Sequence, residues 1–370
     1  MAALCLSLML CAGCWNYQEI SDVTFIAGAG VDADPAGGYI LTLETVDFSG
    51  GDAGTTPKSS LITTSAPTIA QAVENAERSV SARLYWNHAS TFVIGESLAE
   101  ENIMPVLDFI MHNLDTAMNV WLLAAESGTA QSVFGLKTRG SAIVSYALRD
   151  IMQDNPHFGQ TIPQRLFEAL PGLKSSDRAV LTALVSQVNQ NGEDTISVSG
   201  CAVMRGARRL STLDGDQTAA ALALQGRLSR RVLEINTGEE MAAVQLLGVE
   251  RSLAASTQGE RLRLEIRVDA GYAPIQIPVG GVGHTEKSLT ARVEEAVHEE
   301  LTEIINHAQT NLGCDIFGVG AYLQAHNPEL WELYAGTWDA AFSWAEISVT
   351  VNARMVRDST GPGTMEAAGS

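Results

Sequence analysis

The sequence predicts a multi-domain α+β protein with mixed and antiparallel sheets and packed helices. Three patterns indicate this class. β-rich runs and helix-like runs alternate along most of the 370 residues. Residues 261–268 (RLRLEIRV) alternate between polar and apolar side chains, as a strand does when one face of its sheet is wet. Near residues 287–312 apolar side chains recur every three or four positions, which is typical of a long amphipathic helix.

The chain begins with a predicted hairpin, because residues 22–31 and 39–48 are β-rich and flank the turn-rich DADPAGG. A polar loop is expected over 49–65, where Gly, Ser and Thr are frequent. A helix is expected over 68–83, with Thr68 as its N-cap. The next strand, helix and strand predict a βαβ-like unit at 90–94, 98–113 and 119–125.

The middle of the chain predicts a helix over 141–154 and then a second hairpin, 178–188 and 195–204, around the turn NQNGED. Over 206–225 we expect a short strand and an Ala-rich helix, with Asp214 and Asp216 as cap candidates. A domain boundary is placed near 205–226.

The C-terminal part predicts strands, the long helix, two short helices and a final strand. The strands are expected at 231–236, 241–249, 261–270 and 274–279, the short helices at 317–324 and 328–334, and the last strand at 345–355. The predicted organisation is a signal peptide (1–13), an N-terminal region that can hold two subdomains (14–205), a C-terminal domain (206–357) and a disordered tail (358–370).

The charge balance bears on the choice of partners. Lys plus Arg is 23 and Asp plus Glu is 43, so the formal net charge is −20. Nucleic-acid affinity comes largely from Lys and Arg that displace counterions, so the charge argues against nucleic-acid binding and we expect no nucleic-acid partner. The same charge disfavours adsorption to anionic lipid. Membrane association would therefore need a hydrophobic or covalent anchor.

The N-terminus predicts such an anchor. Residues 1–13 (MAALCLSLMLCAG) are uncharged and mostly apolar, but too short to span a bilayer, which takes about 20 residues. They suit a signal peptide, and Ala12-Gly13-Cys14 matches the end of a bacterial lipobox. We expect cleavage before Cys14 and a diacylglycerol with further acyl chains on that residue, which would hold the body firmly on a membrane. Because the first basic residue is Lys58, we expect translation to start upstream of Met1.

Sequence motifs that could carry catalysis are incomplete. The GAGVDA of residues 28–33 leads into a strand, whereas dinucleotide binding needs a helix there. Residues 280–288 resemble a P-loop but carry Glu286 where a glycine is required. Glu295 and His298 form an ExxH without the second copy that di-iron proteins need, so they are interpreted as part of a solvated acidic face. We expect no enzyme activity, metal or dissociable cofactor.

Two other residue sets point to structural roles. Cys201 and Cys314 remain after the signal peptide and Cys14, and the sequence leaves their pairing open. Trp331 and Trp338, with neighbouring Phe and Tyr residues, are interpreted as an aromatic core cluster.

Three stretches resemble the Ger(x)C family of spore-germination lipoproteins. Residues 14–20 (CWNYQEI) are similar to the family's mature start, and 83–88 (RLYWNH) with 93–96 (VIGE) to its "rlyf–H … vigE" stretch. Residues 309–342 resemble the pattern "Q…DifGfG … P..W … W…F". The resemblance runs from Cys14 to about Arg357. Cys14 is its lipid-attachment residue, and its motif positions with structural or partner-contact roles are Trp15, Glu19, His88, Glu96, Gln309, Asp315, Gly318, Gly320, Pro328, Trp331 and Trp338.

The resemblance implies a three-domain α+β fold and a C subunit of a nutrient germinant receptor from a Gram-positive spore former. Such subunits lack catalytic activity. They are lipid-anchored on the outer face of the spore's inner membrane, beside integral membrane subunits of the A and B types. Two alternatives stay open: a solute-binding lipoprotein with a cleft for amino acids or sugars, and a surface-anchored hydrolase with an acid pair or a metal.

Overall fold

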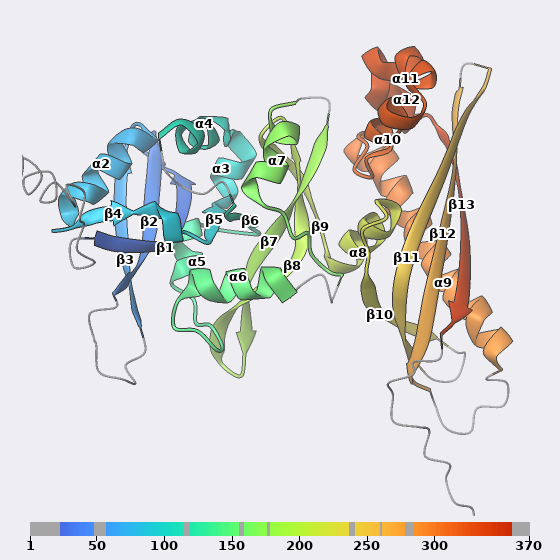
Figure 1. The fold of residues 1–370 in the computed structure, drawn as a ribbon, viewed down its shortest axis with the longest axis horizontal. Coiled ribbons are helices and arrows are strands. Elements are labelled where there is room, and N and C mark those ends of the chain that lie inside the picture. Colours follow the sequence, from blue (N-terminus) through green and yellow to red (C-terminus); the bar gives the residue numbers. More distant parts are fainter. Residues whose placement is uncertain are drawn as a thin grey trace, which may run out of the picture.

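A computed structural model describes residues 23–47, 57–113, 119–154, 159–175, 178–236, 241–259, 261–277 and 285–356. Within these ranges the strands form a nine-stranded and a four-stranded sheet. Figure 1 shows the two sheets side by side along the longest axis of the molecule, with α8 (Gly215–Leu224) between them. The predicted α+β class with mixed and antiparallel sheets is confirmed.

The first sheet has a parallel centre and antiparallel flanks. β1, β5, β6 and β7 pair in parallel, and β2–β3 on one side and β8–β9 on the other pair antiparallel. The short β4 pairs with the start of β1. In spatial order the strands are β3 (Lys58–Ala66), β2 (Tyr39–Asp47), β1 (Val23–Ala33), β5 (Thr91–Ile94), β6 (Trp121–Ala125), β7 (Ala179–Gln190), β8 (Glu193–Arg205) and β9 (Arg208–Leu213), with β4 at Arg83–Tyr85.

Helices cover both faces of this sheet, because the central strands are apolar on both. On β5, Phe92 and Ile94 belong to the core of one face and Val93 to the core of the other. The first face is covered by α2 (Ile69–Ser79), α3 (Glu96–Glu101), α4 (Met104–Asn113) and α7 (Leu166–Leu173), and the second by α5 (Ala130–Phe134) and α6 (Val144–Asp154).

The second sheet keeps one wet face, as predicted. Along β12 the side chains of Leu264 and Ile266 are buried, whereas those of Glu265 and Arg267 are exposed. The long helix α9 (Glu286–His307) packs on the apolar face through Val293 and its other buried residues. The strands, in spatial order, are β10 (Arg230–Asn236), β11 (Met241–Gln258), β12 (Arg261–Gln276) and β13 (Glu346–Met355), the last parallel to β12.

After α9 the chain makes a π-helical turn and a group of short helices. Figure 1 shows these helices gathered at one end of the second sheet. They are the turn Ala308–Leu312, α10 (Val319–His326), α11 (Pro328–Tyr334), a 3-10 turn (Ala335–Thr337) and α12 (Trp338–Ser343).

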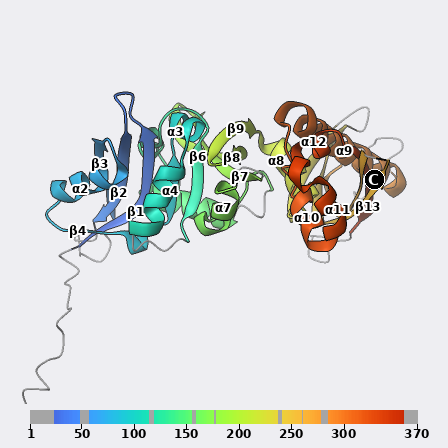
Figure 2. The same ribbon diagram turned by 90° about the horizontal axis from the view of Figure 1, so that it is seen from above.

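One core connects the two sheets. Leu222 of α8 is buried in the same apolar cluster as Val203 of β8 and Val244 of β11. Figure 2, which views the molecule from above, also places α8 between the sheets. The small side chains of the Ala-rich α8 let both sheets approach this helix closely.

Several sequence predictions need correction. Residues 58–65 of the expected loop belong to β3, which pairs with β2 along its length. The helix expected over 98–113 is broken at Asn102, the C-cap of α3. The strand expected at 241–249 is part of the longer β11, and those expected at 261–270 and 274–279 fall on one strand, β12, which ends at Gln276. Helices α5 and α7 were not predicted.

The first sheet continues through β9 to Leu213, beyond residue 205, where the sequence places the end of the N-terminal region. Both hairpins, the βαβ-like unit, the helix after Thr68 and the final strand are confirmed. The predicted signal peptide, Cys14 and the tail over 358–370 lie outside the described residues.

Candidate functional site

The C-terminal motif residues meet in one compact corner between α9 and β13. The partly buried Asp315 carboxylate accepts hydrogen bonds from the N–H groups of Phe317 (2.9 Å) and Gly320 (2.7 Å). Burial raises the pKa of Asp315, and these N–H groups oppose that shift because they stabilise the charged form. Asp315 thereby fixes the chain where α10 begins. We call Gln309, Asp315, Gly318, Gly320, Pro328, Trp331 and Trp338 the C-terminal corner.

The glycines of the C-terminal corner have steric roles. Gly318 has φ +72°, the left-handed region that favours glycine. A Cβ at Gly320 would lie 2.9 Å from the Trp338 ring and 3.0 Å from Trp331. The two tryptophan rings are 5.2 Å apart between centroids, so the predicted aromatic cluster is present.

The other two corner positions fix neighbouring segments. The Gln309 side-chain amide donates to the carbonyl oxygens of Phe342 (2.8 Å) and Ala345 (3.0 Å), which ties the π-helical turn to the start of β13. Pro328 occupies the first turn of α11, where a missing N–H costs nothing. The corner residues thus hold one another in place.

His88 and Glu96 lie apart from that corner and from each other, at opposite ends of β5. His88 is exposed and contacts the rings of Phe25 (5.2 Å) and Tyr85 (5.6 Å). Glu96 accepts from the N–H of Gly128 (2.8 Å).

Glu96 also connects α3 to the last strand of the first sheet. The buried Arg209 side chain of β9 donates to Glu96 (3.0 Å) and to Glu100 (2.7 Å). The Gly128 hydrogen bond above all, and Arg209 in addition, lower the pKa of Glu96. Trp15 and Glu19, like Cys14, lie outside the described residues.

Sequence reasoning missed two buried carboxylates of the first hairpin. Asp32 accepts from the N–H groups of Ala130 (2.6 Å) and Gln131 (3.1 Å), at the start of α5. Glu44 accepts from Val144 (2.8 Å) and from Ser145, at the start of α6. A charged residue inside an apolar strand, as in LTLETV, is the signal that could have revealed them.

The ExxH motif of the sequence gains no further metal-type ligands among the described residues. Glu295 and His298 are exposed on α9, in agreement with the predicted acidic face. No group of three or more His, Cys, Asp or Glu suitable for a metal occurs in the described ranges. Burial raises the pKa of the Cys201 thiol to about 12 and that of Cys314 to about 11, and both are free.

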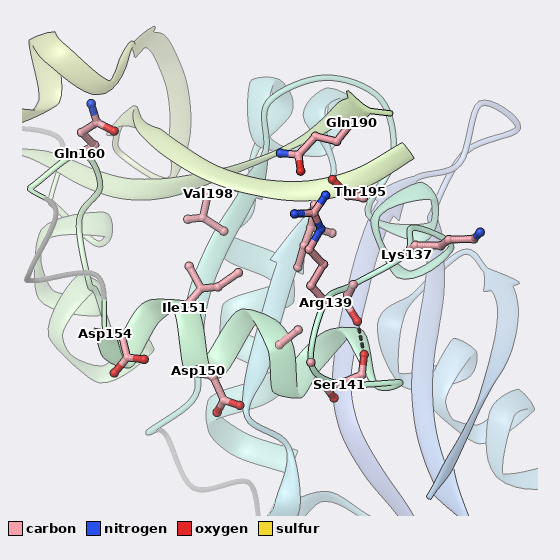
Figure 3. A pocket seen from close by; sticks show the side chains of 14 residues that line it. Lys137, Arg139, Ser141, Asp150, Ile151, Asp154, Gln160, Gln190, Thr195 and Val198 are labelled. Carbon is pink, nitrogen blue, oxygen red and sulfur yellow. Dashed lines mark hydrogen bonds between the residues drawn. The ribbon is translucent and has the colours of Figure 1, made fainter. Parts of the chain in front are cut away.

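A cavity of about 610 Å³ opens beside α6, and we call it the α6–β8 cavity. Figure 3 shows Ile151 of α6 and Val198 of β8 pointing toward each other across it. Its rim carries Arg139 on the segment before α6 and Asp154 at the end of α6. Its size falls within the range of small-molecule sites.

Comparisons with known proteins agree with one another. The family model described as "Spore germination protein N-terminal domain" matches residues 16–186, and "Spore germination B3/ GerAC like, C-terminal" matches residues 199–359. Spore germination protein KC of Bacillus subtilis (strain 168) is 25% identical, over 96% of this chain and 94% of the relative. Spore germination protein B3 of the same organism is 20% identical, over 95% and 96%.

A solved structure shares the fold. The crystal structure of the GerBC protein superposes with a TM-score of 0.60 at 16% identity, and the match covers 89% of this chain and 97% of that one. Within the described residues no helix is both long and apolar enough to cross a membrane.

Proposed function

The chain belongs to the GerAC family of spore germination proteins, and on that premise we propose that it is a lipid-anchored subunit of a nutrient germinant receptor. The observation that carries the proposal is the pair of consecutive family matches, which together span residues 16–186 and 199–359. The subunit would act through contacts with integral membrane subunits, without catalysis of its own.

The placement of the motif residues supports a scaffold role. Asp315, Gly320 and Gln309 are taken up by contacts within the C-terminal corner, and Glu96 by contacts with Gly128 and Arg209. These residues keep the body rigid instead of reacting with a substrate. A rigid body with a broad exposed surface suits a protein that transmits a change between neighbours.

The anchor is the second part of the proposal. The net charge of −20 gives the body no electrostatic attraction to anionic lipid, so acyl chains on Cys14 would provide the attachment. Tethering would confine the body near the membrane surface and raise its effective concentration for A-type and B-type membrane subunits.

Replacing the acylated cysteine tests this proposal. We expect Cys14→Ala to leave the fold intact and to release the protein from membranes, with loss of acyl label. The matched control is Cys5→Ala, which alters a cysteine within the predicted signal peptide and should leave anchoring unchanged. Membrane fractionation and metabolic acyl labelling measure both. A Cys14→Ala protein that stays lipid-modified and membrane-bound would contradict the anchor.

A further inference from the structure

The α6–β8 cavity has fixed walls. The segment before α6 is bound to the β7–β8 hairpin: the N–H of Lys137 donates to the Asp194 carbonyl (3.2 Å), and the N–H of Ile196 donates to the Lys137 carbonyl (3.3 Å). At its other end, the N–H of Val144, the first residue of α6, donates to the Glu44 carboxylate of β2 (2.8 Å). The segment is therefore held at both ends, and the cavity is a feature of the folded backbone.

The floor of the cavity is apolar. On α6, Ala147, Ile151 and Asp154 are spaced by four and three residues, so they share the helix face that lines the cavity. β8 contributes Ile196 and Val198 from the opposite side. A carbon chain lying between Ile151 and Val198 would be removed from water on two sides.

Two charged side chains of opposite sign, Arg139 and Asp154, line the cavity without an ion-pair partner in the described ranges. Lys137 pairs with Glu193 (2.7 Å), and Asp150 pairs with Arg149 (2.8 Å). Arg139 also faces Glu193, whose carboxylate is already engaged by Lys137. Within the described ranges, neither Arg139 nor Asp154 has an ion-pair partner, and both line the cavity. In Figure 3 they lie on either side of Ile151 and Val198.

We propose that the α6–β8 cavity binds a small zwitterion of the amino-acid class. Its carboxylate would pair with Arg139, its ammonium group with Asp154, and its carbon chain would lie on Ile151 and Val198. An arginine fork suits a carboxylate because it donates two parallel hydrogen bonds. The proposal deepens the receptor role by naming a ligand class and rests on that proposed function, but it does not depend on the lipid anchor.

Calorimetry on the purified full chain in detergent tests the proposal. The probes are glycine, 4-aminobutyrate and 6-aminohexanoate, which share two charges and differ in their separation. Hexanoate and hexylamine keep the carbon chain and carry one charge each. We expect at least one zwitterion to bind about tenfold or more tightly than either singly charged probe, the usual scale for a lost hydrogen bond to a charged group.

Paired variants locate the binding. We expect Arg139→Gln and Asp154→Asn each to weaken that zwitterion about tenfold. The controls Arg178→Gln and Asp108→Asn alter exposed residues outside the cavity and should leave affinity unchanged. Cys14→Ala should also bind normally, so failure of the anchor is distinguishable from failure of the cavity.

Three results would overturn the proposal. One is no zwitterion binding at about 10 mM, far above the usual range of specific ligands. Another is equal affinity for hexanoate, hexylamine and the zwitterions, which would show a site that reads only the carbon chain. The third is unchanged binding in both Arg139→Gln and Asp154→Asn.

Discussion

Asp315 gives the sharpest test of the C-terminal corner. Its carboxylate accepts the N–H groups of Phe317 and Gly320 in a partly buried place, and the Val319 N–H and the Trp338 side chain further stabilise its charged form. Asp315→Ala leaves the Phe317 and Gly320 N–H groups without their acceptor. Asp315→Asn keeps one acceptor oxygen and places an NH2 group against the other donor. The two variants therefore remove different numbers of hydrogen bonds from the same site.

The expected magnitudes follow from that count. Each buried donor left without a partner costs about 1–3 kcal/mol, so Asp315→Ala should lower the free energy of unfolding by about 3–5 kcal/mol. Asp315→Asn removes one bond and also relieves the desolvation that raises the Asp315 pKa. We therefore expect it to cost less, about 1–2 kcal/mol. For a domain of about 150 residues, each kcal/mol lowers Tm by about 2–4 °C.

Urea unfolding followed by tryptophan fluorescence measures the effect, since Trp331 and Trp338 pack against Gly320. The exposed Asp108→Ala is the control and should change the unfolding free energy by less than about 0.5 kcal/mol. A change that small in Asp315→Ala, or a greater loss in Asp315→Asn than in Asp315→Ala, would refute the reasoning.

Two further predictions concern the C-terminal corner and the start of α3. Gly320→Ala should cost about 1–3 kcal/mol, because its Cβ would lie 2.9 Å from Trp338, whereas Gly336→Ala meets open space and should be neutral. Equal Tm values for these two variants would contradict the steric argument. The pKa of Glu96 is lowered, chiefly by Gly128, so Glu96 stabilises the fold above its ordinary pKa of 4.5 and this stabilisation is lost as pH falls through the lowered value. Wild type should then lose more stability than Glu96→Gln between about pH 5 and pH 3. Urea unfolding midpoints measured across this pH range test the prediction, and equal decreases in the two proteins would contradict it.

Local signals in the sequence predicted most elements. Thr68 accepts the N–H of Gln71 at the start of α2, and Asp214 accepts that of Gln217 at the start of α8. The helix expected over 328–334 has the observed bounds, because Pro328 marks its first turn. In each case the deciding contacts lie within a few residues, where the sequence displays them directly.

The errors have a common cause. β3 is rich in Ser and Thr and lies at the edge of its sheet, so its period-two pattern is weak, and only pairing with β2 makes it a strand. The break in the helix expected over 98–113 also has a long-range cause. The N–H of Ile103 donates to the carbonyl of Ala207, far along the chain, instead of continuing the helix.

The candidate site also has one part that the sequence predicted and one part that only the structure shows. The motif residues that carry the family resemblance were visible in the sequence, and Gln309, Asp315 and Gly320 indeed lie close together. The roles of Cys14, Trp15 and Glu19 remain predictions. The α6–β8 cavity had no signal, because Arg139 and Asp154 are ordinary surface residue types.

The sequence by itself determined the α+β class, the acidic charge and the family, since each depends on composition, short-range periodicity or a contiguous motif, and the anchor at Cys14 stays a prediction. Only the tertiary structure decided which strands share a sheet, which carboxylates are buried and which charges border a cavity. Asp32 and Ala130, joined by a 2.6 Å hydrogen bond, are 98 residues apart. Contacts of that kind depend on the path of the whole backbone, and no local pattern encodes that path.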